Sequence, residues 1–473
     1  MNIPNILKNR SGGKALKAGI GYTVGNFLVK GITFLTLPLF SRLMTTAQFG
    51  SYNVFVSYEA ILYVIIGLAI HTSVQSANLE FKGEISDYVS SVSLIYIINA
   101  LFLSSVVFIA SEPLTGIMNF SKGVLWLLIL YSLGTSLMQL YNNKISLNYD
   151  YKKYLAVSLT YSAGSVILSL ILMFLMKTGE RDLSRMIGTS TAAMAAAVFI
   201  LVSFYSDAVP KYEKKYWSFA VKYSLPIVPH GIAQVLLAQF DRIMIRHMIG
   251  NAEAGIYSLA ANIKLILTVI TTSIATAWRT WFYRTMSEGK KNEIQKRAGQ
   301  ILLGYAALTV LLACGSKEIV LILGGKSYEM AKYVAVPMIA DAFLLFVYNI
   351  IVQSEYYAKK THYVMFGTLA AAVINVITNY IFIKMYGFIA AAYTTLFSYA
   401  VFLALHLYIS RKTAGFVIIK PKRLVFAMAI VCAVSVISIV FVDSLPIRAL
   451  TAMAAVVVLV LTLYKDMGRE SYA

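Results

Sequence analysis

The sequence predicts an all-α membrane protein that crosses the bilayer about fourteen times. Hydrophobic residues make up 59% of the 473 residues and charged residues only 13%, about half the charged share of a soluble domain. The mean hydropathy is +0.72. Apolar stretches of about 20 residues, the length of a transmembrane helix, recur along the whole chain. They lack the alternating polarity of a membrane β-barrel, so helices must satisfy the backbone hydrogen bonds within the lipid.

The fourteen predicted spans form two sets of six and a final pair. The first set lies at 15–40, 54–73, 89–110, 124–141, 155–176 and 187–204. The second set lies at 227–249, 256–277, 298–323, 334–351, 363–382 and 388–409, and the pair at 424–442 and 445–463. Connections of at most about 20 residues leave no room for a catalytic or nucleotide-binding domain. We therefore expect a transporter and not an enzyme.

The basic residues indicate how the chain is oriented. The formal net charge is +20, with 41 Lys and Arg. With the N-terminus in the cytoplasm, about 27 of these 41 fall on the cytoplasmic side and about 11 outside, as the positive-inside rule requires. We expect both termini to be cytoplasmic and the basic loops to contact anionic membrane lipids. Nucleic-acid binding is not needed to explain the charge.

Motifs for cofactors and metals are not found in the sequence. The glycine-lysine segment at 12–15 lacks the Ser or Thr and the upstream Gly of a phosphate-binding loop. Cys314 and Cys432 have no metal-ligand spacing and are expected to be packing residues. The five histidines are scattered singly along the chain. We expect no metal and no cofactor.

An internal repeat relates the two sets of six spans. GSYNVFVSYEAIL at 50–62 aligns without gaps to GIYSLAANIKLIL at 255–267, and the two copies share Gly, Tyr, Ile and Leu. Six spans separate the copies, so both copies have the same orientation, which indicates a parallel repeat.

The repeat and the charged connections predict the organisation of the chain. Its parts are a cytoplasmic segment 1–14, an N-lobe 15–206, a cytoplasmic linker 207–218, a C-lobe 219–410, a cytoplasmic linker 411–423, two helices in 424–464 and a cytoplasmic tail 465–473.

Five short motifs resemble one known superfamily. They are SRL at 41–43, FGSY at 49–52, QFDR at 239–242, AGIY at 254–257 and YGFIAAA at 386–392. In this order, and with six plus six plus two spans, they are similar to the multidrug/oligosaccharidyl-lipid/polysaccharide (MOP) exporter superfamily. The resemblance is to its polysaccharide transporter branch of Wzx-type flippases, and it covers essentially the whole chain.

The resemblance implies two lobes around a central cavity that opens alternately to each side of a bacterial inner membrane. The implied substrate is an undecaprenyl-diphosphate-linked oligosaccharide, a repeat unit of O-antigen, capsule or a related polysaccharide, moved from the cytoplasmic to the periplasmic leaflet. A polysaccharide polymerase and a chain-length regulator are implied partners. The alternative within the superfamily is a cation-coupled exporter of drugs or small metabolites, similar to the MATE (multidrug and toxic compound extrusion) family.

Charged residues inside the predicted spans, together with Arg279 two residues beyond the span 256–277, are the candidates for function, because a charge near the bilayer centre is costly and usually faces protein or water. The basic candidates for a cationic, diphosphate-binding cavity are Lys30, Arg242, Lys264 and Arg279. The acidic candidates for coupling to H⁺ or Na⁺ are Glu59, Asp241 and Asp341.

A structural explanation of the same charges remains open. Asp241 with Arg242, and Glu59 with Lys264, could form ion pairs that stabilise the bundle. Glu59 and Lys264 occupy equivalent positions in the two repeat copies, which would put them at one depth. Two other classes of protein remain as alternatives to a transporter: a membrane glycosyltransferase or polymerase, and a scaffold without transport activity.

Overall fold

The computed structural model describes residues 10–468, which form helices and connecting turns without a strand. The predicted cytoplasmic segment 1–14 and tail 465–473 fall partly outside this range, at 1–9 and 469–473. The described chain divides into two compact units, one with residues up to Met44 and Ser51–Gln239, the other with Thr45–Gly50 and the chain from Phe240 onward. The division therefore falls inside two helices, α3 (Thr46–Gly67) and α11 (Val228–Met248).

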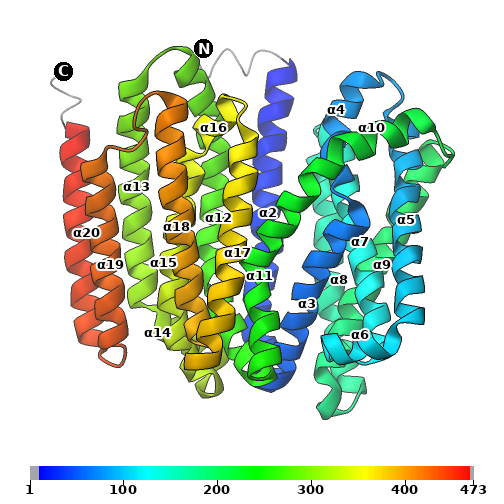
Figure 1. Cartoon of the computed structure of the whole chain (residues 1–473), viewed down its shortest axis with the longest axis horizontal. Helices are drawn as coiled ribbons and strands as arrows, with labels where there is room; N and C mark the ends of the chain where they lie inside the picture. Colours follow the sequence, from blue (N-terminus) through cyan, green and yellow to red (C-terminus); the bar gives the residue numbers. More distant parts are fainter. Residues whose placement is uncertain (1–9, 469–473) are drawn as a thin grey trace. The chain divides into compact units, whose positions relative to one another are not determined.

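The helices follow one another in chain order (Figure 1). Up to the division they are α2 Arg10–Leu43, α3 Thr46–Gly67, η1 Ile70–Ser73, α4 Val74–Glu80, α5 Ile85–Ile109, α6 Ser111–Met118, α7 Lys122–Leu147, α8 Tyr151–Leu175, η2 Thr178–Glu180, α9 Arg181–Asp207, α10 Lys214–Ser224, η3 Leu225–Ile227 and α11 Val228–Met248. After it come α12 Asn251–Ser287, α13 Lys291–Cys314, α14 Ser316–Gly324, η4 Lys326–Ala331, α15 Lys332–Ile351, α16 Gln353–Tyr357, α17 Thr361–Tyr386, α18 Ala390–Ala414, α19 Pro421–Val440 and α20 Leu445–Gly468.

Thirteen helical segments of the described chain are long and apolar enough to cross a membrane. They correspond to thirteen of the fourteen predicted spans. The remaining span, 227–249, is helix α11, but Gln234, Gln239, Asp241 and Arg242 interrupt its apolar run. Its mean hydropathy is therefore too low for it to count as a span by composition alone.

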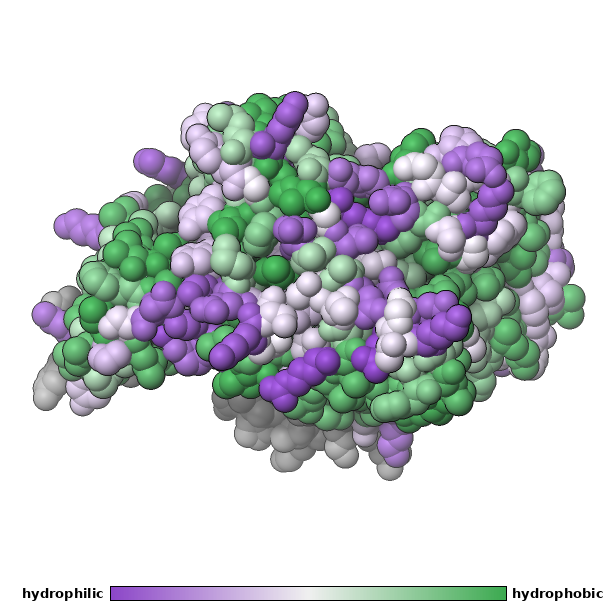
Figure 2. Space-filling model, turned by 90° about the horizontal axis from the view of Figure 1, so that it is seen from below, coloured by the Kyte–Doolittle hydropathy of each residue, from purple (hydrophilic) through white to green (hydrophobic). Residues whose placement is uncertain are grey.

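Large apolar side chains are exposed on the long helices, as expected of surfaces in contact with lipid. Leu35 on α2, Phe108 on α5 and Phe174 on α8 are each more than three-quarters exposed. Figure 2 shows many hydrophobic side chains on the surface, with hydrophilic side chains gathered in patches among them. The chain is thus a multi-pass membrane protein.

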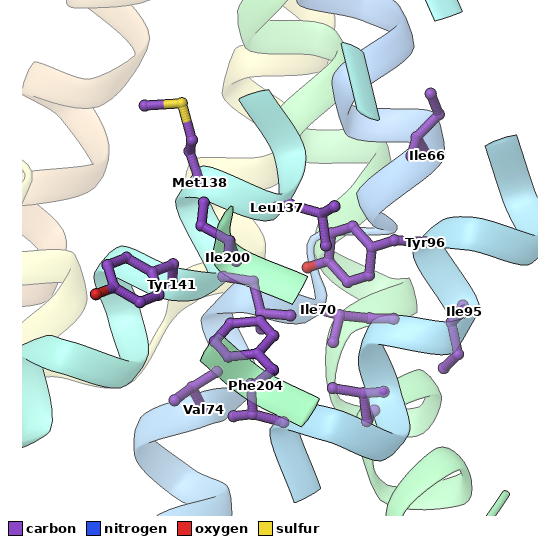
Figure 3. Packing of buried hydrophobic residues seen from close by; sticks show 14 of the residues in the cluster. Ile66, Ile70, Val74, Ile95, Tyr96, Leu137, Met138, Tyr141, Ile200 and Phe204 are labelled. Atoms are coloured by element: carbon purple, nitrogen blue, oxygen red, sulfur yellow. The ribbon is translucent and has the colours of Figure 1, made fainter. Parts of the chain in front are cut away.

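The core of the first unit is formed by side chains of α3, η1, α4, α5, α7, α9 and α10, part of which Figure 3 shows. Tyr96, Leu137 and Phe204 are fully or almost fully buried in it. Small residues let these helices approach closely, which is typical of helix packing in membranes. A Cβ on Gly134 of α7 would lie 2.5 Å from the carbonyl oxygen of Ala193 on α9, so only glycine fits at this crossing.

The second unit is built around α15. Of the residues in the most apolar stretch of Lys326–Tyr357, 89% are buried. Helix α15 packs against α12, α13, α18 and α19. Helices α19 and α20 lie beside α13 (Figure 1). The buried guanidinium of Arg448 on α20 donates 2.8 Å and 2.5 Å hydrogen bonds to the two carboxylate oxygens of Glu318 on α14. Asp443, before α20, accepts hydrogen bonds from Lys317 at 2.6 Å and Lys332 at 2.9 Å.

The two glycines that open the repeat copies meet at one helix crossing in the second unit. A Cβ on Gly50, at the start of α3, would lie 1.8 Å from the carbonyl oxygen of Asn251. A Cβ on Gly255, at the start of α12, would lie 2.0 Å from the carbonyl oxygen of Thr46. The first turns of α3 and α12 therefore touch backbone to backbone, and the relation between them is reciprocal, as in a pair related by a two-fold axis.

Candidate functional site

Asp241 lies at the centre of a buried polar cluster in the second unit. Its carboxylate accepts hydrogen bonds from the Tyr257 hydroxyl of α12, from the Thr395 hydroxyl of α18 at 2.9 Å and from the Asn379 amide of α17 at 2.7 Å. Asp241 is only 4% exposed. Three neighbouring helices thus supply one donor each to a carboxylate that α11 carries.

Two further side chains complete this group. Asn375 donates to the hydroxyl of Thr395 at 2.9 Å and accepts from Asn379 at 3.1 Å, and Thr394 donates to the side-chain oxygen of Asn379. We call Asp241, Tyr257, Asn375, Asn379, Thr394 and Thr395 the Asp241 cluster. A buried network of this kind is stable only because each polar group finds a partner. Its carboxylate, amide and hydroxyl oxygens are ligands that a hard cation prefers.

Lys264 and Asp341 form an ion pair between α12 and α15. Asp341 is fully buried, whereas the side chain of Lys264 is 20% exposed. The ammonium group also lies 5.1 Å from the centre of the Tyr399 ring, a cation–π contact. This pairing was not predicted from the sequence, in which Glu59 is the expected ion-pair partner of Lys264 and Asp341 has no assigned partner. A substrate-binding candidate and an ion-coupling candidate are thus partners of each other.

Glu59 is the buried carboxylate of the first unit. It lies on α3, is 7% exposed and accepts a hydrogen bond from the Thr135 hydroxyl of α7. Tyr63, Tyr131 and Tyr161 interact with it electrostatically. The carboxylate thus accepts a hydrogen bond from one hydroxyl group and interacts electrostatically with three tyrosines.

The remaining candidates differ in exposure. Lys30 on α2 and Arg242 on α11 are partly buried, and Arg279 near the end of α12 is exposed. Arg242 directly follows Asp241 on α11 and interacts with it electrostatically. Arg242 therefore adjoins the Asp241 cluster, and Asp341, the partner of Lys264, also interacts electrostatically with Asp241.

Sequence reasoning missed three features. Asn375 and Asn379 are four residues apart in an apolar span, and this spacing, which puts them on one helix face, could have indicated the cluster. The Arg185 guanidinium lies 3.8 Å from the ring centre of Phe40 and 3.9 Å from that of Tyr52. The third feature is the buried pair of Glu355 and His406.

The part of the chain that the structure describes contains no group of three or more His, Cys, Asp or Glu residues that could hold a metal ion. Cys314 is buried and Cys432 is exposed, and neither forms a disulfide.

The fold is that of known membrane exporters. A solved structure of the lipid II flippase MurJ in an inward closed conformation superposes with a TM-score of 0.72 over 95% of this chain and 99% of that chain, at 16% identity. An inward-facing multidrug resistance MATE family transporter of the MOP superfamily superposes with a TM-score of 0.62 over 85% of this chain and 98% of that one, at 12% identity. The chain therefore has the fold of these MOP exporters.

The sequence comparisons specify the family. The family described as polysaccharide biosynthesis protein matches residues 15–286, more than half of the chain, and the MatE family matches residues 226–381. The chain belongs to the polysaccharide biosynthesis protein family within the MOP superfamily, which confirms the resemblance seen in its motifs.

Two relatives extend this comparison. Lsg locus putative protein 1 of Haemophilus influenzae is 20% identical over 375 residues, covering 77% of this chain and 90% of that protein. The probable low-salt glycan biosynthesis flippase Agl15 of Haloferax volcanii is 21% identical over 402 residues, covering 82% of each chain.

Proposed function

We propose that this protein is a flippase for lipid-linked oligosaccharides. The observation that carries the proposal is the match to the polysaccharide biosynthesis protein family over residues 15–286. A relative named as a glycan biosynthesis flippase and the MurJ-like fold support it. The substrate is an undecaprenyl-diphosphate-linked repeat unit of O-antigen, capsule or a related polysaccharide, and it moves from the cytoplasmic to the periplasmic leaflet by alternating access of lobes 15–206 and 219–410.

The diphosphate of the carrier lipid is bound by basic side chains. Arg242 suits this role because a guanidinium binds phosphate oxygens in a bidentate manner. Lys264 contributes when it exchanges Asp341 for the diphosphate, so neutralisation of Asp341 by a bound cation releases the ammonium group for the substrate. Lys30 and the exposed Arg279 act as earlier contacts along the path of the anionic headgroup.

An ion gradient drives the transport cycle. The Asp241 cluster is the proposed coupling site, because one buried carboxylate and several neutral oxygens from four helices match the ligand preference of a hard cation such as Na⁺. Asp341 and Glu59 are the further carboxylates that take up H⁺ or Na⁺. The chain itself carries out no covalent chemistry.

The protein lies in the bacterial inner membrane with both termini in the cytoplasm. This proposal depends on the excess of Lys and Arg in the loops on that side. A polysaccharide polymerase and a chain-length regulator receive the translocated units.

Transport assays in proteoliposomes test the proposal. Purified protein is reconstituted with a lipid-linked oligosaccharide, and a periodate-type reagent outside the vesicles reports sugars that reach the outer leaflet. We expect the protein to accelerate their appearance, and Arg242→Ala to slow it while Arg411→Ala, an exposed residue near the end of α18, does not. No acceleration with a range of lipid-linked sugars and imposed ion gradients would refute the flippase assignment.

A MATE-like exporter of drugs or small metabolites is the second candidate function. The MatE match at 226–381 favours it. Efflux of cationic dyes by cells that express the protein, together with normal surface polysaccharide in cells that lack it, would support this candidate over the flippase.

A further inference from the structure

Glu355 and His406 form a buried acid–imidazole pair in the second unit. Nδ1 of His406, on α18, lies 2.8 Å from Oε1 of Glu355, on α16. Both side chains are 0% exposed. The two residues are 51 positions apart, so the contact joins the short helix α16 to the long helix α18.

The pair is enclosed on each side by packed side chains. The His406 ring contacts the rings of Tyr348 on α15, with 4.9 Å between centroids, and Phe402 on α18, with 4.6 Å. From α17, Gly367 lies so close that a Cβ there would be 2.4 Å from Nε2 of His406. Four helices therefore exclude lipid and bulk water from the imidazole.

One atom on each side chain lacks a hydrogen-bond partner. These are Oε2 of Glu355 and Nε2 of His406, both buried. A purely structural ion pair normally satisfies its remaining oxygens and nitrogens, because an unpaired buried polar atom costs about 1–3 kcal/mol. The pair thus keeps one imidazole nitrogen and one carboxylate oxygen without a hydrogen-bond partner within one closed site.

Proton counting gives the two states of this site. With Nδ1–H of a neutral imidazole donating to an ionised Glu355, the pair carries one negative charge, and Nε2 keeps an available lone pair. Addition of one proton to Nε2 gives an imidazolium beside a carboxylate, with no net charge. A buried site with no net charge avoids the cost of an isolated charge in a medium of low dielectric constant.

Neighbouring titratable and charged groups come from three elements. On α15 this is Tyr348, and on α16 it is Tyr356, both of which interact electrostatically with Glu355. On α12, Arg279 and Tyr283 interact with Tyr356. The group that α17 presents to the ring is the uncharged Gly367. The exposed Arg279 thus interacts electrostatically with Tyr356, which in turn interacts with Glu355.

We propose that Glu355 and His406 form a proton-binding site, distinct from the Asp241 cluster, that takes up and releases one proton at Nε2 of His406. The two sites are separated along α18 by the 11 residues from Thr395 to His406, a rise of about 16 Å. The role of this proton in transport rests on the proposed function, but its binding does not.

Nuclear magnetic resonance of the histidine nitrogens tests the binding directly. The full-length protein is labelled with ¹⁵N-histidine, purified and titrated between pH 5 and pH 9, and His406→Gln identifies the His406 signals among those of the five histidines. We expect Nε2 of His406 to gain a proton within this range. In Glu355→Gln, which removes the negative partner of the imidazolium, the pH response of the His406 nitrogens should differ from that of the unaltered protein.

His362→Gln is the matched control, because His362 is an exposed histidine on α17. It should leave the His406 titration unchanged. If His406→Gln does not fold, single replacement of the other four histidines assigns the signals instead. A His406 that keeps one protonation state across the whole range, or that titrates identically in Glu355→Gln, would overturn the proposal.

Transport measurements then separate this inference from the proposed function. In a working flippase, Glu355→Gln and His406→Gln should flatten the pH dependence of transport, whereas His362→Gln should keep it. If His406 titrates in a protein that moves no lipid-linked sugar, the proposed proton site is supported and the proposed flippase function is contradicted. Transport with an unaltered pH profile in both variants would remove the coupling role of the site.

Discussion

Replacing Gly255 by alanine should force apart the first turns of α3 and α12. The added Cβ would lie 2.0 Å from the Thr46 carbonyl oxygen and 3.0 Å from the backbone nitrogen of Gly50. An ordinary contact needs about 3.4 Å or more, so the two backbones must separate by more than 1 Å. Overpacking of this kind costs about 1–3 kcal/mol, which exceeds the gain of up to about 1 kcal/mol from placing alanine in a helix.

The assay is thermal unfolding of the purified protein in detergent, in which size-exclusion chromatography measures the folded protein that remains after heating to each temperature. Gly255→Ala should lower the melting temperature by several degrees. The matched control is Gly304→Ala on α13, where a Cβ would meet nothing within 4 Å and helix propensity should leave the temperature unchanged or raise it slightly. Equal melting temperatures for Gly255→Ala and Gly304→Ala would refute the close crossing.

Three further predictions follow from the charged groups. Asp241→Asn should fold but lose at least about tenfold in transport rate, measured in proteoliposomes with and without a Na⁺ gradient. Lys264→Met should destabilise the protein by about 3–5 kcal/mol because it leaves Asp341 buried without its partner, whereas the double variant with Asp341→Leu should recover much of the loss in thermal unfolding. Hydrogen bonds from Lys317 and a second lysine lower the pKa of Asp443 to about 2. The stabilisation of the folded protein by the ionised Asp443 is therefore complete above the ordinary Asp pKa of about 4 and is lost as the pH falls through about 2. Asp443→Asn should therefore have a lower melting temperature than the unaltered protein at pH 5 but not at pH 2.

The helices and the family were predictable because both depend on local sequence. Apolar runs of about 20 residues are unambiguous in a membrane chain, and α11 departs from the pattern only because polar residues interrupt it. The glycine motif at 50 and 255 was also visible as a repeat. That the two glycines touch each other was not, because contact depends on how two helices are rotated and spaced.

The candidate site was predicted less completely. Burial of Glu59, Asp241 and Asp341 follows from their place in apolar spans, but their partners come from distant helices. Lys264 pairs with Asp341, 77 positions away, and rotation of each helix about its axis decides such a pair. Arg279 lies two residues beyond the predicted span 256–277 and is exposed, since α12 extends well beyond the length that a bilayer requires.

The length of α12 has a mechanical consequence. Its 37 residues make a rod of about 55 Å, against a hydrocarbon layer of about 30 Å, and the rod is held at one end by the glycine crossing at Gly255. If it pivots there as a rigid body, a tilt of about 10° displaces Ser287, about 48 Å from the pivot, by about 8 Å. A small rocking motion at the fulcrum is thus amplified at the far tip, where a spin label on Ser287 would record it.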